Sequence, residues 1–268
     1  MAHNSDSTHS HIHRPDGHCC GASRRNFLKT TALVTGGALF TGTIASRALH
    51  AKSAGTAAGR RIDTHFHFYP PEFKNDLGSG VGSRWSPQVA LDQMDKNGVA
   101  SSVFSLSSMP QEWFRKDPEW LRKAVRTIND YAAQMVRDKP KRYGLWALLP
   151  MPDVEGSLKE IEYAFGTLKA DGIGIPTNYG DKWPGDPKFM PIFEELNRRK
   201  AVVYFHPNAP YCCGNLQPGI NTSWVEYPHD TTRAVISLLF NGTFAKCRDI
   251  RFLFSHGGGT IPMLAGRL

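Results

Sequence analysis

Cysteine is scarce in this sequence, and its distribution argues against two kinds of protein. Only five of the 268 residues are cysteine, and Cys212, Cys213 and Cys247 are those beyond the first 51 residues. Their number is odd and they include no Cys-x-x-Cys spacing, so neither a disulfide framework nor a thiolate zinc site is indicated. We interpret the adjacent Cys212 and Cys213 as loop or packing residues.

A hydrophobic run long enough to span a bilayer is also lacking. The stretch TTALVTGGALFTGTIA is diluted by glycine and threonine and falls short of the roughly 20 apolar residues that a spanning helix needs. It follows the pair Arg24-Arg25 and precedes SRALHA, whose small residues offer a signal peptidase a cleavage site. The pattern predicts that residues 1–51 are a twin-arginine signal peptide. The mature chain is then expected to be periplasmic, with no membrane segment.

The sequence has no block of basic residues either. Its 32 Lys and Arg and 24 Asp and Glu give a net charge of +8. The predicted leader holds five of the basic and two of the acidic residues, which leaves 27 and 22, a net charge of +5, for the rest of the chain. A small charge spread over about two hundred residues indicates a solvated surface, and we expect no nucleic-acid partner.

What the sequence does have is a regular alternation of short apolar runs and amphipathic runs, which begins after a small-residue linker at 52–60. Strand patterns occur at 61–66, 100–107, 143–150, 172–178, 202–207 and 250–256, and helical patterns at 87–96, 118–137, 154–170, 187–199 and 231–245. Nearly continuous apolar strands between helices predict an α/β fold with a parallel sheet. At about 38 residues per unit, we expect residues 61–268 to form an incomplete (β/α)8 TIM barrel of about six units.

The histidines are concentrated at strand ends. Six of the 11 lie in the predicted leader, and four of the other five close strand patterns: His65 and His67 the first, His206 the fifth and His256 the sixth. Residues two apart on a strand point to the same face, and the carboxyl ends of parallel barrel strands share the face that holds active sites. The pattern predicts a metal or catalytic cluster. His229, placed in a loop before the 231–245 helix, is expected to line the site or cap that helix.

Several motifs carry a resemblance to a known family. DTHFH, the segment from GIGIPTNYGD to VVYFHP, YPHDTTRAVISLLFNGTF and FLFSHGGGTIPMLAGR resemble the amidohydrolase superfamily. More narrowly, they are similar to its branch containing aminocarboxymuconate-semialdehyde decarboxylase and 6-methylsalicylate decarboxylase. The spacing H-G-G-G-x-x-P-x-x-x-G-R is the most specific element, and the similarity runs through residues 61–268.

The resemblance implies a TIM barrel that binds one divalent metal ion, with zinc expected and manganese the alternative. His65, His67 and His206 match metal ligands, and His256 matches a catalytic acid/base. Arg267 matches an arginine that binds the substrate carboxylate from a neighbouring subunit, which implies a homodimer. The family's further ligand, an aspartate after strand eight, has no counterpart here, so we expect a C-terminally truncated member.

The implied activity is metal-dependent, non-oxidative decarboxylation of a small aromatic or muconate-like carboxylic acid. Two alternatives stay open: a hydrolase of the same superfamily, acting on a lactone or amide, and an inactive truncated fragment. Fold resemblance alone does not decide the reaction. By position only, Arg84, Trp85 and Asn178 are candidate substrate contacts.

Overall fold

The computed structural model describes residues 61–77, 82–213 and 219–268. The predicted leader and linker lie outside the described residues. The described part contains one sheet of six strands, all parallel, paired in the order of the sequence. The strands are β1 (Arg61–His67), β2 (Val99–Ser105), β3 (Tyr143–Leu148), β4 (Gly172–Pro176), β5 (Val202–His206) and β6 (Arg251–Phe254).

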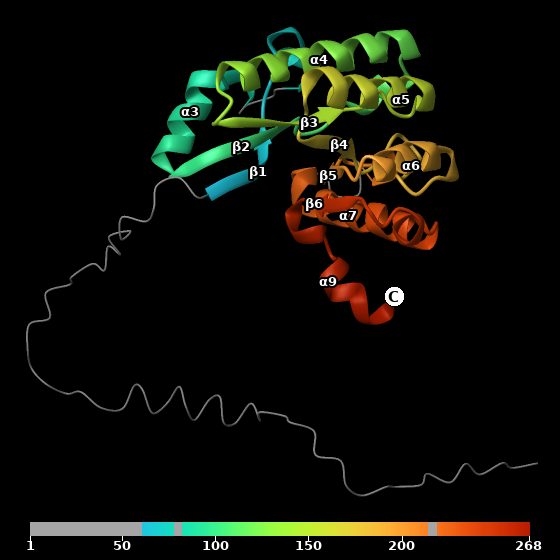
Figure 1. Ribbon diagram of the computed structural model, residues 1–268. Helices are drawn as coiled ribbons and strands as arrows, with labels where there is room; N and C mark the ends of the chain where they lie inside the picture. The colour runs from blue at the N-terminus through green and yellow to red at the C-terminus, as the bar shows by residue number, and fades with distance from the viewer. Residues whose placement is uncertain (1–60, 78–81, 214–218) are drawn as a thin grey trace, which may run out of the picture. The chain divides into compact units, whose positions relative to one another are not determined.

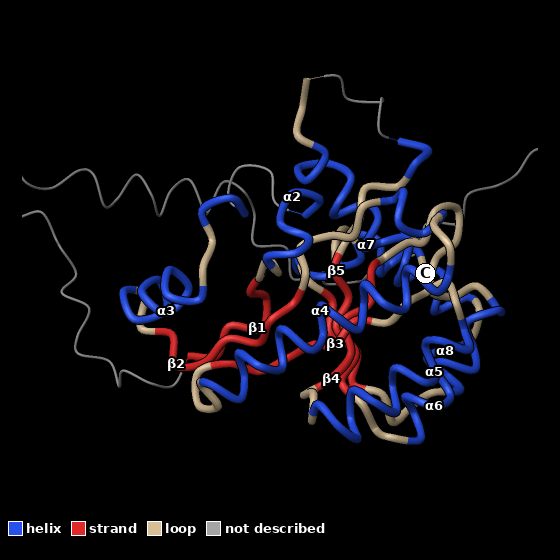
Figure 2. Tube along the Cα trace, turned by 90° about the horizontal axis from the view of Figure 1, so that it is seen from above, coloured by secondary structure: helices blue, strands red, loops and turns tan. Residues whose placement is uncertain are grey.

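The helices run between the strands, apart from α9, which follows β6, and the longer ones cover one face of the curved sheet (Figures 1 and 2). They are α2 (Lys74–Leu77), α3 (Pro87–Lys96), α4 (Pro118–Asp138), α5 (Val154–Tyr163), α6 (Met190–Arg198), α7 (Thr222–Phe240), α8 (Thr243–Lys246) and α9 (Ile261–Leu264). Six parallel β/α units wound in sequence order are a partial TIM barrel. This confirms the predicted fold class.

Central and outer strands differ in burial. All five residues of β4 are buried and so are five of the six residues of β3, whereas β1 and β6 are partly exposed, with Ile62 64% accessible. Within the described residues β1 pairs only with β2, and β6 only with β5. The buried strands pack on helices α4 to α6 through residues such as Ile128, Ile161 and Phe193.

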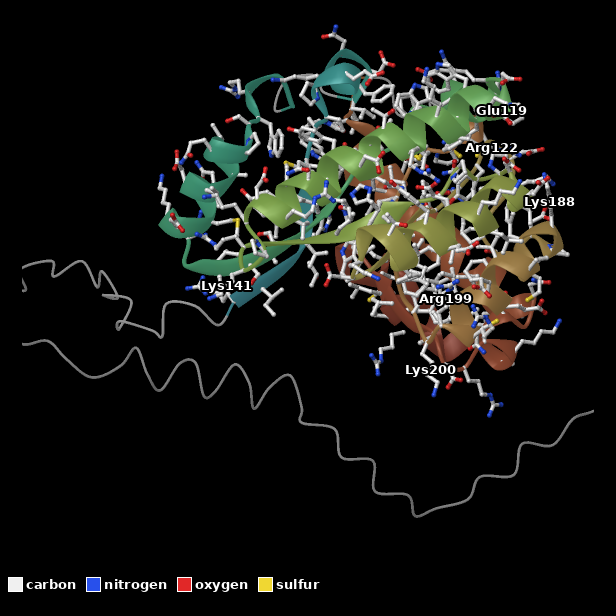
Figure 3. All side chains as sticks on the ribbon, turned by 45° about the horizontal axis from the view of Figure 1, so that its top comes forward. Glu119, Arg122, Lys141, Lys188, Arg199 and Lys200 are labelled. Atoms are coloured by element: carbon white, nitrogen blue, oxygen red, sulfur yellow. The ribbon has the colours of Figure 1, made fainter. Side chains whose placement is uncertain are left out.

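Helix starts follow the sequence signals closely. The Ser86 side chain accepts a hydrogen bond from the Val89 amide at the start of α3, and Asp117 caps α4 in the same way. Each cap precedes a proline at the first helical position, where the missing N–H costs nothing. The outer helices carry surface ion pairs. One joins Glu119 and Arg122 of α4, labelled in Figure 3, whose Oε1 and Nη1 atoms are 2.8 Å apart.

The prediction of a helix over 231–245 was wrong about its start. Helix α7 begins at Thr222, capped by the Asn221 side chain, and continues through Pro228 to Phe240. Pro228 has no N–H, so it donates no hydrogen bond to the carbonyl of Trp224 one turn earlier. The hydroxyl of Thr232 donates to the Pro228 carbonyl at 2.9 Å, one turn further along the helix.

Long apolar helices are absent from the part of the chain that the structure describes. None of the helices found there is both long enough and hydrophobic enough to cross a membrane.

Candidate metal centre

His65 and His67 stand side by side at the carboxyl end of β1. Their Nε2 atoms are 3.1 Å apart. Asp63, two residues earlier, accepts a hydrogen bond from the His65 backbone amide at 2.9 Å and so fixes the end of the strand. The predicted pairing of these two rings on one face of a strand is present.

His206 joins them from the end of β5. It is buried, and its ring centroid lies 5.1 Å from that of His65 and 4.7 Å from that of His67. The ring nitrogens of the three histidines that could bind an ion all lie within 4.8 Å of one another. In the described part of the chain no carboxylate belongs to this group.

Hydrogen bonds on the far side of two rings orient their free nitrogens. His206 Nδ1 lies 3.0 Å from the Pro207 carbonyl oxygen, and His67 Nδ1 lies 3.4 Å from the Ser105 carbonyl oxygen. A carbonyl only accepts, so His206 Nδ1 carries the proton and donates, which leaves a lone pair on its Nε2 for the cluster, as histidine ligands of metals are usually arranged. His67 Nδ1 also lies 3.3 Å from the Ser105 hydroxyl, which can donate or accept.

Protonation of the cluster is disfavoured by its surroundings. Burial, together with the neighbouring His65, lowers the pKa of His67 to about 4. Burial and the adjacent imidazoles hold the pKa of His206 well below its usual range, and burial with His256 nearby lowers that of His65. Neutral imidazole is the form that binds metal.

The donor set fits a divalent ion. Zinc–nitrogen bonds of about 2.0–2.1 Å in a tetrahedron place neighbouring nitrogens roughly 3.3 Å apart, close to the 3.1 Å between His65 Nε2 and His67 Nε2. Three imidazole ligands leave further coordination positions for substrate, as catalytic sites require. The three predicted ligands therefore form a plausible metal site by geometry and by chemistry.

His256 lies beside the three histidines. It follows β6 with a positive φ of 53°, at the start of three glycines that also have positive φ. Its ring centroid is 5.0 Å from His65 and 5.5 Å from His206, and burial lowers its pKa. A side chain added at Gly259 would come within 2.2 Å of the Pro228 carbonyl oxygen, so this turn requires glycine to pack on α7.

Two residues that line the site were missed by the sequence reasoning. Tyr227 of α7 places its ring 6.0 Å from His206 and 5.9 Å from His256. Tyr204 of β5 lies 6.0 Å from His65 and stacks on Trp146 of β3. The signal available for Tyr204 was its position two residues before His206 on the same strand, which puts both side chains on one face.

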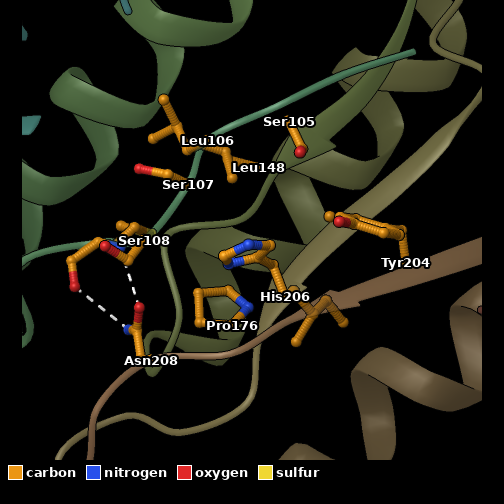
Figure 4. A pocket seen from close by; sticks show the side chains of 12 residues that line it. Ser105, Leu106, Ser107, Ser108, Leu148, Pro176, Tyr204, His206 and Asn208 are labelled. Carbon is orange, nitrogen blue, oxygen red and sulfur yellow. Dashed lines mark hydrogen bonds between the residues drawn. The ribbon is translucent and has the colours of Figure 1, made fainter. Parts of the chain in front are cut away.

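A small cavity beside His206 continues the site into the barrel (Figure 4). Leu106, Leu148 and Ile175 give it an apolar wall, and Ser105 and Asn208 add polar groups. Asn208 is held by two hydrogen bonds of 3.2 Å, from the Met109 amide to its Oδ1 and from its Nδ2 to the Met109 carbonyl. The cavity therefore has rigid walls.

A buried carboxylate, Asp230 of α7, supports the end of β4 behind the site. It accepts hydrogen bonds from the Thr177 hydroxyl, from Asn178 Nδ2 at 2.6 Å and from Trp183 Nε1 at 2.9 Å. Asn178 is fully buried and its Nδ2 also donates to the Asn208 carbonyl at 3.0 Å. Asn178 is thus engaged within the protein, which weakens its prediction as a substrate contact.

The remaining predicted residues lie further out. His229 is within α7 and exposed, with Nδ1 2.6 Å from the Val225 carbonyl oxygen, so it does not cap the helix. Arg267 is exposed at the end of the 3-10 helix η8 (Ala265–Arg267). Trp85 packs against Tyr69 and Phe104. The roles of Arg84 and Arg267 stay predictions.

The sequence of this chain matches a known protein family over nearly the whole of the described domain. Residues 62–267 match the amidohydrolase family. The chain belongs to this family. It is 37% identical over 223 residues to a decarboxylase of Aspergillus niger, a match covering 77% of this chain and 61% of that protein. It is 33% identical over 217 residues to the 6-methylsalicylic acid decarboxylase of Penicillium expansum, covering 77% of this chain and 67% of the relative.

A solved structure shares the fold of this family member. The dihydroxybenzoic acid decarboxylase of Polaromonas sp. JS666, determined with bound manganese and the inhibitor 2-nitroresorcinol, superposes with a TM-score of 0.69 at 22% identity. The match covers 78% of this chain and 69% of the other. The chain spans roughly two thirds of the length of these proteins, and the predicted resemblance to amidohydrolase-type decarboxylases is confirmed.

Proposed function

We propose that this protein is a metal-dependent, non-oxidative decarboxylase of a small aromatic carboxylic acid. The observation that carries the proposal is the convergence of His65, His67 and His206 with His256 beside them. The names of the two curated relatives support the reaction type. A muconate-like acid remains within the proposed substrate class.

Each group in the site has a distinct part in this proposal. A divalent ion bound by His65, His67 and His206 would supply a Lewis acid for an oxygen of the substrate. The cavity lined by Leu106, Leu148 and Ile175 has a volume of about 20 Å³, room for one water and not for an aromatic ring, so these residues form an apolar boundary of the site beside His206. His256 delivers the proton to the ring carbon that loses carbon dioxide, a step for which imidazole is suited.

Zinc is the ion we propose, with manganese as the alternative. The three imidazole nitrogens match zinc coordination, whereas the Polaromonas decarboxylase holds manganese. Dialysis of the purified protein against a chelator, followed by titration with each ion, separates the two: the native ion restores turnover at one equivalent per chain.

The test of the reaction is direct. The purified protein is incubated with 6-methylsalicylate and other hydroxybenzoates, and carbon dioxide release is measured beside a panel of lactones and amides. We expect decarboxylation without oxidation of the ring. His256→Ala should keep its metal and lose about 100-fold or more in turnover, since a positioned acid contributes 10²–10⁴. Hydrolysis of the panel without carbon dioxide release would favour the hydrolase alternative instead.

We also propose that the protein works as a homodimer in the periplasm. Arg267 is exposed and available to bind the carboxylate of a substrate in the site of a second copy. Mixing Arg267→Ala chains with His256→Ala chains should then restore part of the activity that each variant lacks, because one site of the mixed dimer has both groups. Activity of the mixture no greater than that of either variant would exclude sharing.

A further inference from the structure

Two adjacent thiols lie on a turn that follows β5. Cys212 and Cys213 belong to the 3-10 turn η6 (Tyr211–Cys213), a few residues beyond His206. Their sulfur atoms are 2.7 Å apart. Non-bonded carbon atoms, which are smaller than sulfur, sit roughly 3.5–4.0 Å apart. The two atoms that a disulfide would join are therefore already in contact.

The two thiols differ in exposure. Cys212 is exposed, whereas Cys213 is 8% accessible and its sulfur lies 3.8 Å from Arg233 Nη2. The hydrogen bond with Cys212, together with burial, raises the pKa of Cys213 to about 11. Cys212 is then the thiol that meets an oxidant in solution, and Cys213 is placed to react with it afterwards.

Other partners for these thiols are less accessible. The only other cysteine in the described residues, Cys247, is 2% accessible at the end of α8. A buried thiol in apolar surroundings is poorly reactive, and burial raises the pKa of Cys247. Oxidation of Cys212 is thus directed to its neighbour.

We propose that Cys212 and Cys213 form an oxidisable dithiol, a modification site that a hydroperoxide closes into a vicinal disulfide. The Cys212 thiolate attacks a peroxide oxygen, the O–O bond breaks, and the departing hydroxide takes up a proton as water, leaving a sulfenic acid on Cys212. The Cys213 sulfur then attacks the Cys212 sulfur, the S–O bond breaks, and a second water leaves. Two thiols and one hydrogen peroxide thereby give one disulfide and two waters.

The product is expected to be readily reversible. Neighbouring Cα atoms are about 3.8 Å apart, below the roughly 4.4–6.8 Å usual for disulfides, and such strain makes the bond easier to reduce. The turn also forms part of a cavity of about 500 Å³. Cys212 and Tyr211 line it, and Arg115 lies 4.2 Å over the Tyr211 ring. Closing the disulfide therefore changes the wall of this cavity.

Peptide mapping of the full-length protein tests the proposal. Trypsin releases residues 201–233, which contain both thiols and no methionine, while the cysteines of residues 1–51 fall in a different peptide. After treatment with hydrogen peroxide and alkylation with iodoacetamide, we expect this peptide to lose two hydrogen atoms and take up no label. Dithiothreitol before alkylation should restore double labelling. Double labelling after peroxide, or a disulfide to Cys247 or to a second chain, would overturn the proposal.

Two matched variants separate the roles of the thiols. In Cys213→Ser, the Cys212 sulfenic acid has no partner and should be captured by dimedone, whereas the unmodified protein should show little capture. Cys247→Ser should form the vicinal disulfide as the unmodified protein does. Equal dimedone capture with and without Cys213 would show that Cys213 does not resolve the sulfenic acid.

Discussion

Replacement of Asp230 tests how much its buried hydrogen bonds contribute to the stability of the protein. Its carboxylate, with no accessible surface, accepts hydrogen bonds from Thr177, Asn178 and Trp183. Two of these partners are fully buried as well, so the donors cannot turn to water when the carboxylate is removed. The perturbation is Asp230→Ala.

The expected loss of stability follows from the buried hydrogen-bond donors that lose their acceptor. A buried donor left without a partner costs about 1–3 kcal/mol. Thr177 and Asn178 are both in this position, whereas the half-buried Trp183 can reach solvent. Asn178 keeps its bond to the Asn208 carbonyl, whereas Arg233, whose Nη1 lies 3.6 Å from the Asp230 carboxylate, loses an ion-pair partner. We therefore expect the free energy of unfolding to fall by about 3 kcal/mol.

Urea unfolding followed by circular dichroism measures this change. Asp230→Asn keeps one acceptor oxygen and should lose less than Asp230→Ala. The control is Asp92→Ala, which removes an exposed carboxylate bonded only to Gln88 on α3 at 2.8 Å and should change stability by less than about 0.5 kcal/mol. A loss of under about 1 kcal/mol for Asp230→Ala, or one equal to that of the control, would refute the reasoning.

Two further predictions concern the metal and the leader. The double change of His65 and His67 to Ala should abolish stoichiometric zinc or manganese, measured by elemental analysis, because two of three ligands are lost; His229→Ala, an exposed residue of α7, should retain it. Replacing Arg24 and Arg25 by Lys should leave the protein in the cytoplasm on cell fractionation, because the arginine pair specifies the twin-arginine route; unchanged export would contradict that assignment.

Local signals were enough to predict the strands and the histidine positions. The i, i+2 spacing of His65 and His67 fixes a shared face whatever surrounds the strand. His206 and His256 were predictable because parallel strands end at one edge of the sheet. These inferences need only the period of a strand and the direction of the chain.

Features that depend on distant neighbours were not predictable in the same way. Asp230 lies more than 45 residues from each of the partners Thr177, Asn178 and Trp183, so its burial has no local cause. The start of α7 was misjudged because the helix continues through Pro228, a residue that locally disfavours a helix interior. Tertiary contacts account for the burial of Asp230.

The distance between His65 and His256 shows that the sheet must be curved to bring these residues together. His65 lies on β1 and His256 follows β6, the two outermost strands of the six-stranded sheet. Five steps of about 4.8 Å would separate those strands by roughly 24 Å in a flat sheet. The two rings nevertheless lie 5.0 Å apart. Their contact therefore depends on sheet curvature, which interior side chains such as Trp146 and Tyr204, stacked at 6.0 Å, help to set. The geometry of the candidate site thus depends on core packing as well as on the histidines themselves.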